Sequence, residues 1–267
     1  TITVTVPGIS SGTVGTGFSQ SFSQSGGTGS VTFSTSSTLP NGVTLNSNGT
    51  LSGTPTQAGT FPIVVKATDS AGCMGTSSTY NLVISCQTIT VSNPATTTGV
   101  AGSPFSQTFT QTGALGSATF ATASTLPTGL TLSSSGVLSG TPQQTGTFPI
   151  IVTVADQNLC PGTGSTYTLV IGCPTITVTN PATASGTAGT PFSQTFTQSG
   201  GIGNVSFTTS STLPQGLTLN SNGTLSGTPQ QTGTFPIVVN ATDQNNCPGT
   251  GSTYTLVIGC PTITVTV

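Results

Sequence analysis

The sequence repeats itself without a gap. Asp69, Asp156 and Asp243 lie 87 residues apart, and the same interval separates two series of cysteines. An ungapped period of this length indicates tandem domains, each large enough for a small core of its own. The predicted domains are residues 1–87, 88–174 and 175–261, followed by residues 262–267, which repeat the first six residues of the chain.

Each repeat is predicted to be β-structure throughout. Thr1–Val6 alternates Thr with Ile or Val, which is the period-two pattern of a half-buried strand. About seven short strands per repeat, separated by turn signals, favour a Greek-key sandwich. The predicted fold class is therefore all-β, with three tandem immunoglobulin-like sandwiches in a rod. Beyond the first strand, the expected elements are strands at Phe18–Gln24 and Val31–Thr35, a compact corner at Leu39–Pro55, and a closing hairpin of Phe61–Asp69 with Thr79–Cys86.

Charge is almost absent from the chain. Lys66 and the three repeated aspartates are the only charged residues, and there is no histidine. One lysine cannot displace counterions from nucleic acid or form a basic membrane-surface patch. No apolar run reaches the roughly 18 residues that membrane insertion requires. General acid–base and serine chemistry both need a titratable base, so we expect no enzyme and no cofactor. Weak electrostatic repulsion also favours self-association.

One segment carries a family resemblance. Residues 38–61 read TLPNGVTLNSNGTLSGTPTQAGTF, are followed by VVKATD at 64–69, and recur at 125–148 and 212–235. The segment resembles the immunoglobulin-like repeats of bacterial surface and secreted proteins, which are related to dystroglycan-type cadherin-like modules. The resemblance implies a spacer or adhesive module without catalytic activity. It also implies a protein that is secreted, on the cell surface or in an extracellular matrix.

The repeated aspartates have two interpretations. Acidic residues at the junctions of cadherin-like modules bind calcium, which makes Asp69, Asp156 and Asp243 calcium candidates. Calcium takes six to eight oxygens, however, usually from several carboxylates, and each repeat supplies one carboxylate. We therefore expect a structural role, in which each aspartate ends a strand and accepts hydrogen bonds from loop N–H groups.

The tyrosines and threonines offer little chemistry. Tyr80, Tyr167 and Tyr254 are expected to pack inward from the last strand of each repeat, the alternative being a sugar-stacking platform. The alternating threonines of Thr1–Val6 suggest ice binding, but one such strand per repeat provides no flat array.

Two cysteines per repeat indicate an oxidising exterior. Metal binding is not expected, because no pair has Cys-x-x-Cys spacing and there is no histidine. Cys73 lies at the tip of the closing hairpin and Cys86 at its far end, about 25 Å away at ~3.3 Å per residue. A disulfide requires Cα atoms within about 7 Å. Because the tip lies at the pole where the chain enters a sandwich and the last strand leaves at the opposite pole, the predicted bonds are Cys86–Cys160 and Cys173–Cys247, between consecutive domains.

This pairing leaves Cys73 and Cys260 at opposite ends of the rod. Either further repeats of the same chain follow, or identical subunits join head to tail through Cys260 and Cys73. Such a heterologous contact propagates into a filament. The alternating segment at the C-terminus could likewise complete the sheet of a neighbour by strand addition. Its residues are Thr262, Ile263, Thr264, Val265, Thr266 and Val267.

The sequence also contains N-glycosylation sequons, although the Asn–Gly pairs among them equally predict turns. The predicted function is a structural subunit or segment of an extracellular filament, whose partners are copies of itself or further repeats. The alternatives are the stalk of a large adhesin and a carbohydrate- or ligand-binding module. The candidate glycosylation residues are Asn48, Asn204, Asn222 and Asn240.

Overall fold

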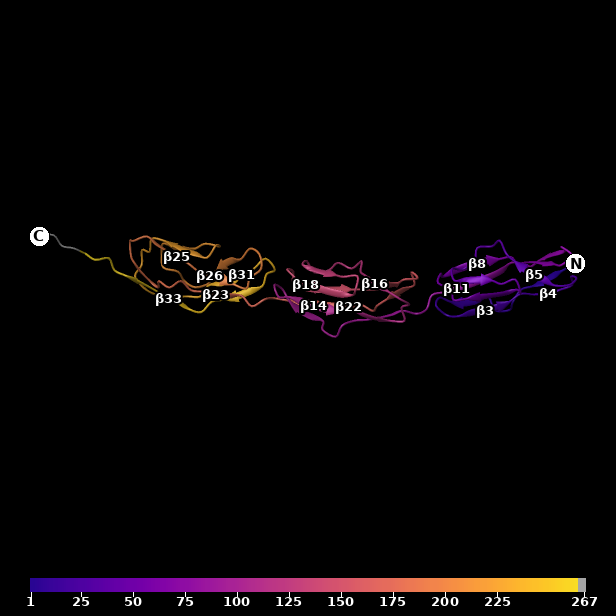
Figure 1. The fold of residues 1–267 in the computed structure, drawn as a ribbon. Helices are drawn as coiled ribbons and strands as arrows, with labels where there is room; N and C mark the ends of the chain where they lie inside the picture. Colours follow the sequence, from indigo (N-terminus) through magenta and orange to yellow (C-terminus); the bar gives the residue numbers. More distant parts are fainter. Residues whose placement is uncertain (264–267) are drawn as a thin grey trace.

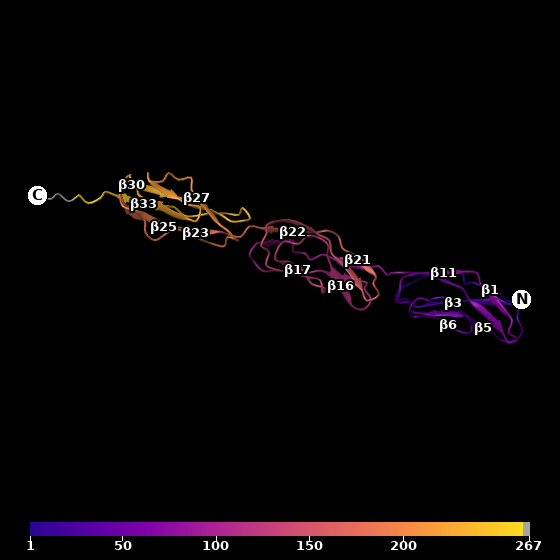
Figure 2. The same ribbon diagram turned by 90° about the horizontal axis from the view of Figure 1, so that it is seen from above.

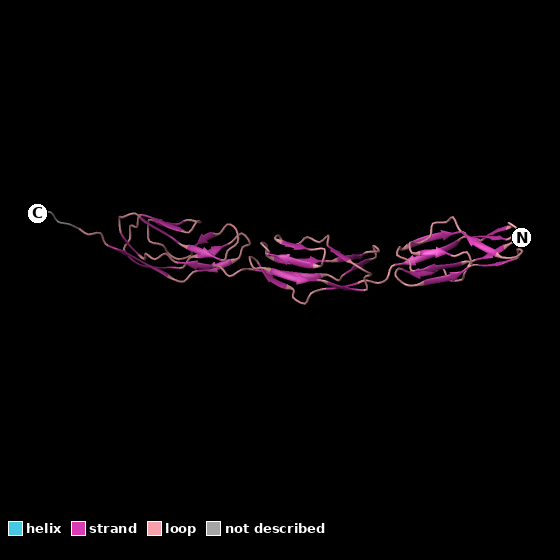
Figure 3. Cartoon of the chain, in the orientation of Figure 1, coloured by secondary structure: helices cyan, strands magenta, loops and turns pink. Residues whose placement is uncertain are grey.

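The chain forms three β-sandwich domains in a row, with the two termini at opposite ends (Figures 1 and 2). The computed structural model describes residues 1–263. These residues contain strands and loops but no helix (Figure 3), and accordingly none of them forms an apolar helix that could cross a membrane. The predicted all-β class is confirmed.

The same order of short strands occurs in every domain. In domain 1 they are β1 (Thr3–Thr5), β2 (Ser11–Thr13), β3 (Phe18–Ser21), β4 (Ser23–Ser25), β5 (Val31–Ser34), β6 (Val43–Leu45), β7 (Thr50–Gly53), β8 (Gly59–Ile63), β9 (Lys66–Asp69), β10 (Met74–Thr76) and β11 (Tyr80–Ser85). In domain 2 they are β12 (Thr90–Ser92), β13 (Thr98–Val100), β14 (Phe105–Thr108), β15 (Thr110–Thr112), β16 (Ala118–Ala121), β17 (Leu130–Leu132), β18 (Val137–Gly140), β19 (Gly146–Ile150), β20 (Thr153–Asp156), β21 (Pro161–Thr163) and β22 (Tyr167–Gly172). In domain 3 they are β23 (Thr177–Thr179), β24 (Ser185–Thr187), β25 (Phe192–Thr195), β26 (Thr197–Ser199), β27 (Ser206–Thr208), β28 (Leu217–Leu219), β29 (Thr224–Gly227), β30 (Gly233–Ile237), β31 (Asn240–Thr242), β32 (Pro248–Thr250) and β33 (Tyr254–Gly259).

Each domain has two layers, shown here for domain 1. One layer contains the β1–β4 pair and the β3–β7–β6 sheet, and the other contains the β2–β11–β8 and β10–β9–β5 sheets. Strand β2 runs parallel to β11, whereas the other pairs of this domain are antiparallel. The last strand therefore pairs with both the start and the penultimate part of its domain, which places its end at the C-terminal pole.

Two sequence expectations were too coarse. The expected corner at Leu39–Pro55 contains a true hairpin, in which β6 pairs with β7. The closing hairpin is not continuous, because Val64 and Val65 separate β8 from β9. There the N–H of Val65 donates to the Ser77 hydroxyl, and the Ser77 N–H donates to the carbonyl of Val65. These bonds replace the regular ladder, so the strand bends without leaving buried polar groups unpaired.

The tyrosines belong to the core. In β11, Tyr80, Leu82 and Ile84 are buried and alternate with outward residues. The ring of Tyr80 makes an edge-to-face contact with Phe22, with the ring centroids 5.4 Å apart, and its hydroxyl donates to the carbonyl of Ile9. Equivalent contacts occur in the other domains. The predicted packing role is confirmed, and the buried rings leave no face for stacking a sugar.

Leu159 has a backbone conformation that suits it poorly. Its φ is 61°, and its side chain is 83% exposed. The equivalent residues are Gly72 and Asn246, which tolerate positive φ far better. We expect Leu159→Asn to raise the free energy of unfolding of domain 2 by about 1 kcal/mol, because strain is removed and no packing is lost. Denaturant unfolding followed by domain-resolved hydrogen exchange measures this. The reverse change, Asn246→Leu, should lower the stability of domain 3 by a similar amount, and unchanged stability in both variants would contradict the interpretation.

Candidate functional site

The junctions between domains are packed as cores. One cluster of buried apolar residues runs through domains 1 and 2 and includes Ile202 of domain 3. Leu115 of domain 2, in the loop between β15 and β16, packs against the same cluster. A Cβ added to Gly15 would collide with Leu115, and one added to Gly102 would lie 3.2 Å from Cδ1 of Ile202. Each junction therefore contains an aliphatic side chain that rests on a glycine of the preceding domain. We call the residue at this position, 28, 115 or 202, the apical residue.

The glycine under each apical residue belongs to a tight turn, which we call the glycine seat (Gly15, Gly102 or Gly189). In each domain the N–H of this glycine donates over 2.8 Å to a proline carbonyl, and that proline ends the Leu-Ser-Gly-Thr-Pro motif. Its φ lies between 77° and 79°, a conformation that favours glycine. Val14 and Ala101, which precede the first two seats, are 1% exposed. The most recognisable sequence motif thus builds the surface that receives the next domain.

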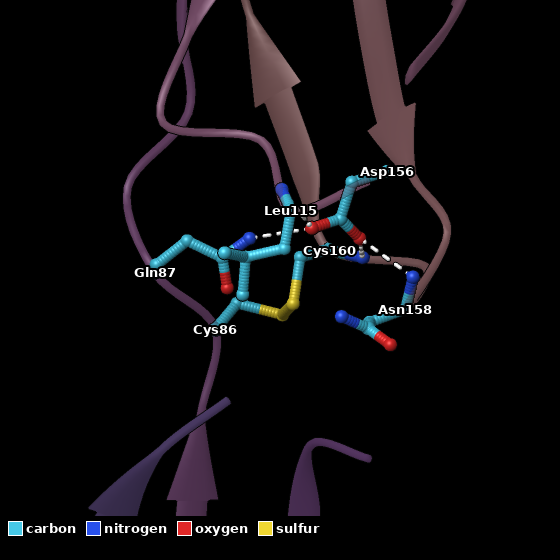
Figure 4. Close-up of a disulfide and its surroundings, with 6 residues drawn as sticks. All are labelled: Cys86, Gln87, Leu115, Asp156, Asn158 and Cys160. Atoms are coloured by element: carbon cyan, nitrogen blue, oxygen red, sulfur yellow. Dashed lines mark hydrogen bonds between the residues drawn. A yellow bond between two sulfur atoms is a disulfide. The ribbon is translucent and has the colours of Figure 1, made fainter. Parts of the chain in front are cut away.

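A single carboxylate organises the N-terminal pole of domain 2 (Figure 4). One oxygen of Asp156 accepts hydrogen bonds from the N–H groups of Asn158 and Cys160, at 2.8 and 3.0 Å. The other oxygen accepts from the N–H of Leu115 at 3.1 Å and from the side-chain amide of Gln87 at 2.5 Å. Asp156 therefore fixes both the apical loop and the cysteine loop.

The same arrangement recurs at the other N-terminal poles. Asp243 accepts from the N–H groups of Asn245, Cys247 and Ile202, and Asp69 accepts from the equivalent N–H groups in domain 1. The predicted structural role of the aspartates is confirmed. Within residues 1–263, no three His, Cys, Asp or Glu side chains gather into a group that could hold a metal ion.

These bonds also alter acidity. The N–H groups of Thr28 and Cys73 hold the pKa of Asp69 below its ordinary value. Burial acts to raise the pKa of Asp156, but the N–H groups of Cys160, Leu115 and Asn158, together with the Gln87 amide, outweigh it and lower the pKa. Both carboxylates are therefore held in the ionised form that accepts these hydrogen bonds.

Disulfides lock both junctions. The structure contains the predicted bonds Cys86–Cys160 and Cys173–Cys247, with Cα–Cα distances of 5.4 and 5.5 Å. Cys160 and Cys247 are completely buried. Cys73 and Cys260 are free and exposed. Each junction thus combines a covalent bond, an apolar contact and a hydrogen-bonded carboxylate within one small region.

The two junctions differ in their polar contacts. Gln87, which bonds to Asp156, is replaced by Pro174 at the second junction. There the side-chain amide of Asn245 instead donates to the carbonyl of Gln143 in domain 2, at 3.0 Å. An open polar recess between domains 2 and 3 lies beside this contact. Sequence reasoning missed the apical residues and Gln87. The available signal was that position 115 alternates among Thr, Leu and Ile in otherwise similar repeats.

The remaining candidates lie away from the junctions. Asn48, Asn204 and Asn222 are exposed, whereas Asn240 is partly buried in β31. Thr262 and Ile263 are exposed and belong to no strand. Thr264, Val265, Thr266 and Val267, the rest of the segment considered for strand donation, lie outside the described residues.

Comparison with known families fits this architecture. A family model described as “Putative Ig domain” matches residues 1–85, 87–172 and 174–259. The chain belongs to this family. The residues left between adjacent matches are Cys86 and Cys173. Each disulfide therefore ties the linker between two family domains to the second of them.

Solved structures with a similar fold are tandem arrays. The three N-terminal domains of the bacteriophage RB49 outer capsid protein Hoc are 13% identical, with 98% of this chain and 100% of that chain covered and a TM-score of 0.35. Titin domains I67–I69 are 11% identical, covering 98% and 99%, with a TM-score of 0.39. Drosophila N-cadherin EC1–3 is 12% identical, covering 88% and 90%, with a TM-score of 0.35. No curated protein matches the sequence significantly.

Proposed function

We propose that the chain is a structural segment of an extracellular fibre and that copies of it join head to tail through Cys260 and Cys73. The observation that supports this is the repetition of the junction. Cys260 stands at the position of Cys86 and Cys173, and Cys73 at that of Cys160 and Cys247, each 87 residues along. The two free cysteines are exposed at opposite poles of the row of domains.

Charge and redox chemistry are compatible with this assembly. The formal net charge is −2, so copies repel one another weakly. A small-molecule disulfide in the extracellular space is the oxidant. The Cys260 thiolate attacks it and releases one small thiol, and the Cys73 thiolate of a second copy then attacks the mixed disulfide and releases the other.

The test uses two single variants, Cys73→Ser and Cys260→Ser. Wild-type protein oxidised with glutathione disulfide should form ladders of polymers on non-reducing gels, and peptide mapping should find Cys73 joined to Cys260. An equimolar mixture of the two variants should stop at the dimer, because each dimer retains no reactive thiol. Polymers that are absent from oxidised wild type, or dimers that form equally well within each variant alone, would overturn the proposal. A monomeric wild type would favour the stalk of a larger adhesin.

A further inference from the structure

The apical residue of domain 1 differs from those of the other domains. Thr28 stands where domain 2 has Leu115 and domain 3 has Ile202. The backbone is nevertheless held in the same way, because the Thr28 N–H donates to Asp69 at 2.9 Å, as Leu115 and Ile202 donate to their own aspartates at 3.1 Å. Domain 1 therefore presents the same loop with a shorter, polar side chain.

The glycine seat of domain 3 is fully formed. The Gly189 N–H donates to the Pro229 carbonyl at 2.8 Å, and the Ala188 N–H donates to the Gly259 carbonyl at 3.0 Å, as in the domains that are followed by another. Within residues 1–263, no heavy atom other than those of its immediate neighbours lies within 4 Å of a Cβ built on Gly189. Ala188 is partly exposed, whereas the equivalent Val14 and Ala101 are 1% exposed.

We infer that this seat is the docking surface for the apical loop of domain 1 in a second copy, and that Thr28 makes the joint between chains weaker than the joints within a chain. This inference rests on the proposed head-to-tail assembly. Threonine has fewer methyl groups to bury than leucine or isoleucine, and its hydroxyl loses water when it is covered. The noncovalent contact between chains is therefore weak, and the Cys260–Cys73 bond holds the joint.

The consequence is a joint that reductants open selectively. Within a chain, Leu115 and Ile202 keep adjacent domains packed even when the disulfides are reduced, and the polypeptide holds those domains at high effective concentration. Between chains neither restraint exists. Reduction should therefore separate a fibre at every third junction and leave three-domain segments.

The experiment compares self-association in the presence of a phosphine reductant, by sedimentation velocity over a concentration series. Thr28→Leu should dissociate about tenfold less readily than wild type, since a larger apolar side chain enters the seat. Thr28→Ser, the matched control, should not associate more strongly than wild type. The double variant Thr28→Leu/Gly189→Asn should lose the gain, because asparagine tolerates the positive φ of Gly189 but fills the seat.

The outcomes separate this inference from the proposed function. If oxidised wild type polymerises through Cys73 and Cys260 but Thr28→Leu associates no more strongly than wild type, the role of Thr28 is wrong and the fibre proposal stands. A gain that persists in the Gly189→Asn double variant reflects nonspecific adhesion and also overturns the inference. Thermal unfolding of each variant confirms that the domains remain folded.

Discussion

Replacing Cys86 and Cys160 by alanine is expected to lower the free energy of unfolding of domain 2 by about 3–4 kcal/mol. The two cysteines are 74 residues apart in sequence, so the bond closes a loop that contains almost the whole of domain 2. Its removal enlarges the conformational freedom of the unfolded domain. It also removes the covalent restraint on the first junction, and the angle between domains 1 and 2 should then vary more.

Domain-resolved hydrogen exchange in a denaturant series measures the first effect, since a chain of three domains does not unfold in one two-state step. Small-angle scattering measures the second, as a broader distribution of interatomic distances in the variant. Cys73→Ala is the matched control, because Cys73 is free and exposed, and it should change neither quantity. Exchange in domain 2 that stays at the wild-type level would show that the bond contributes no stability there.

The disulfide pattern could be derived from the sequence because it depends on few facts. Once each repeat was assigned to a sandwich, the tip of the closing hairpin and the end of the last strand had to lie at opposite poles. Cys73 and Cys86 were then too far apart to bond, whereas Cys86 and Cys160 were adjacent. The structural role of Asp156 followed similarly, from its position at the end of a strand before a short loop.

The apolar part of the junction could not be derived in this way. Leu115 lies in a Gly-Ala-Leu-Gly loop and resembles an ordinary loop residue. Its partner, Gly15, lies in another domain and carries no side chain that a hydrophobic pattern would reveal. The interruption at Val64 and Val65 was missed for a related reason. Continuous β-branched residues predict a continuous strand, and only the Ser77 side chain, twelve residues away, compensates for the break.

Asp156→Ala is expected to destabilise domain 2 by about 3 kcal/mol and to loosen the first junction. The N–H groups of Leu115, Asn158 and Cys160 would lose their acceptor, and each unsatisfied buried donor costs about 1–3 kcal/mol, less where water can reach it. Hydrogen exchange of these amides should rise more than that of the strand centres. Asp69→Ala is the control, since Asp69 holds the equivalent loops at a pole that contacts no other domain within residues 1–263. It should affect domain 1 alone.

The sign of the pH dependence provides a second readout of the same carboxylate. Because the hydrogen bonds depress the pKa of folded Asp156, its contribution to stability is complete above the unfolded value of about 3.9 and is lost as the pH falls through the folded pKa. Wild-type domain 2 should therefore lose stability below about pH 4, and Asp156→Asn should lose much less over that range. An acid limb of equal steepness in the variant would show that another group stabilises the junction. A flattened limb, together with rapid exchange at Leu115 and Cys160, would establish that one carboxylate positions both the apolar and the covalent contacts between domains.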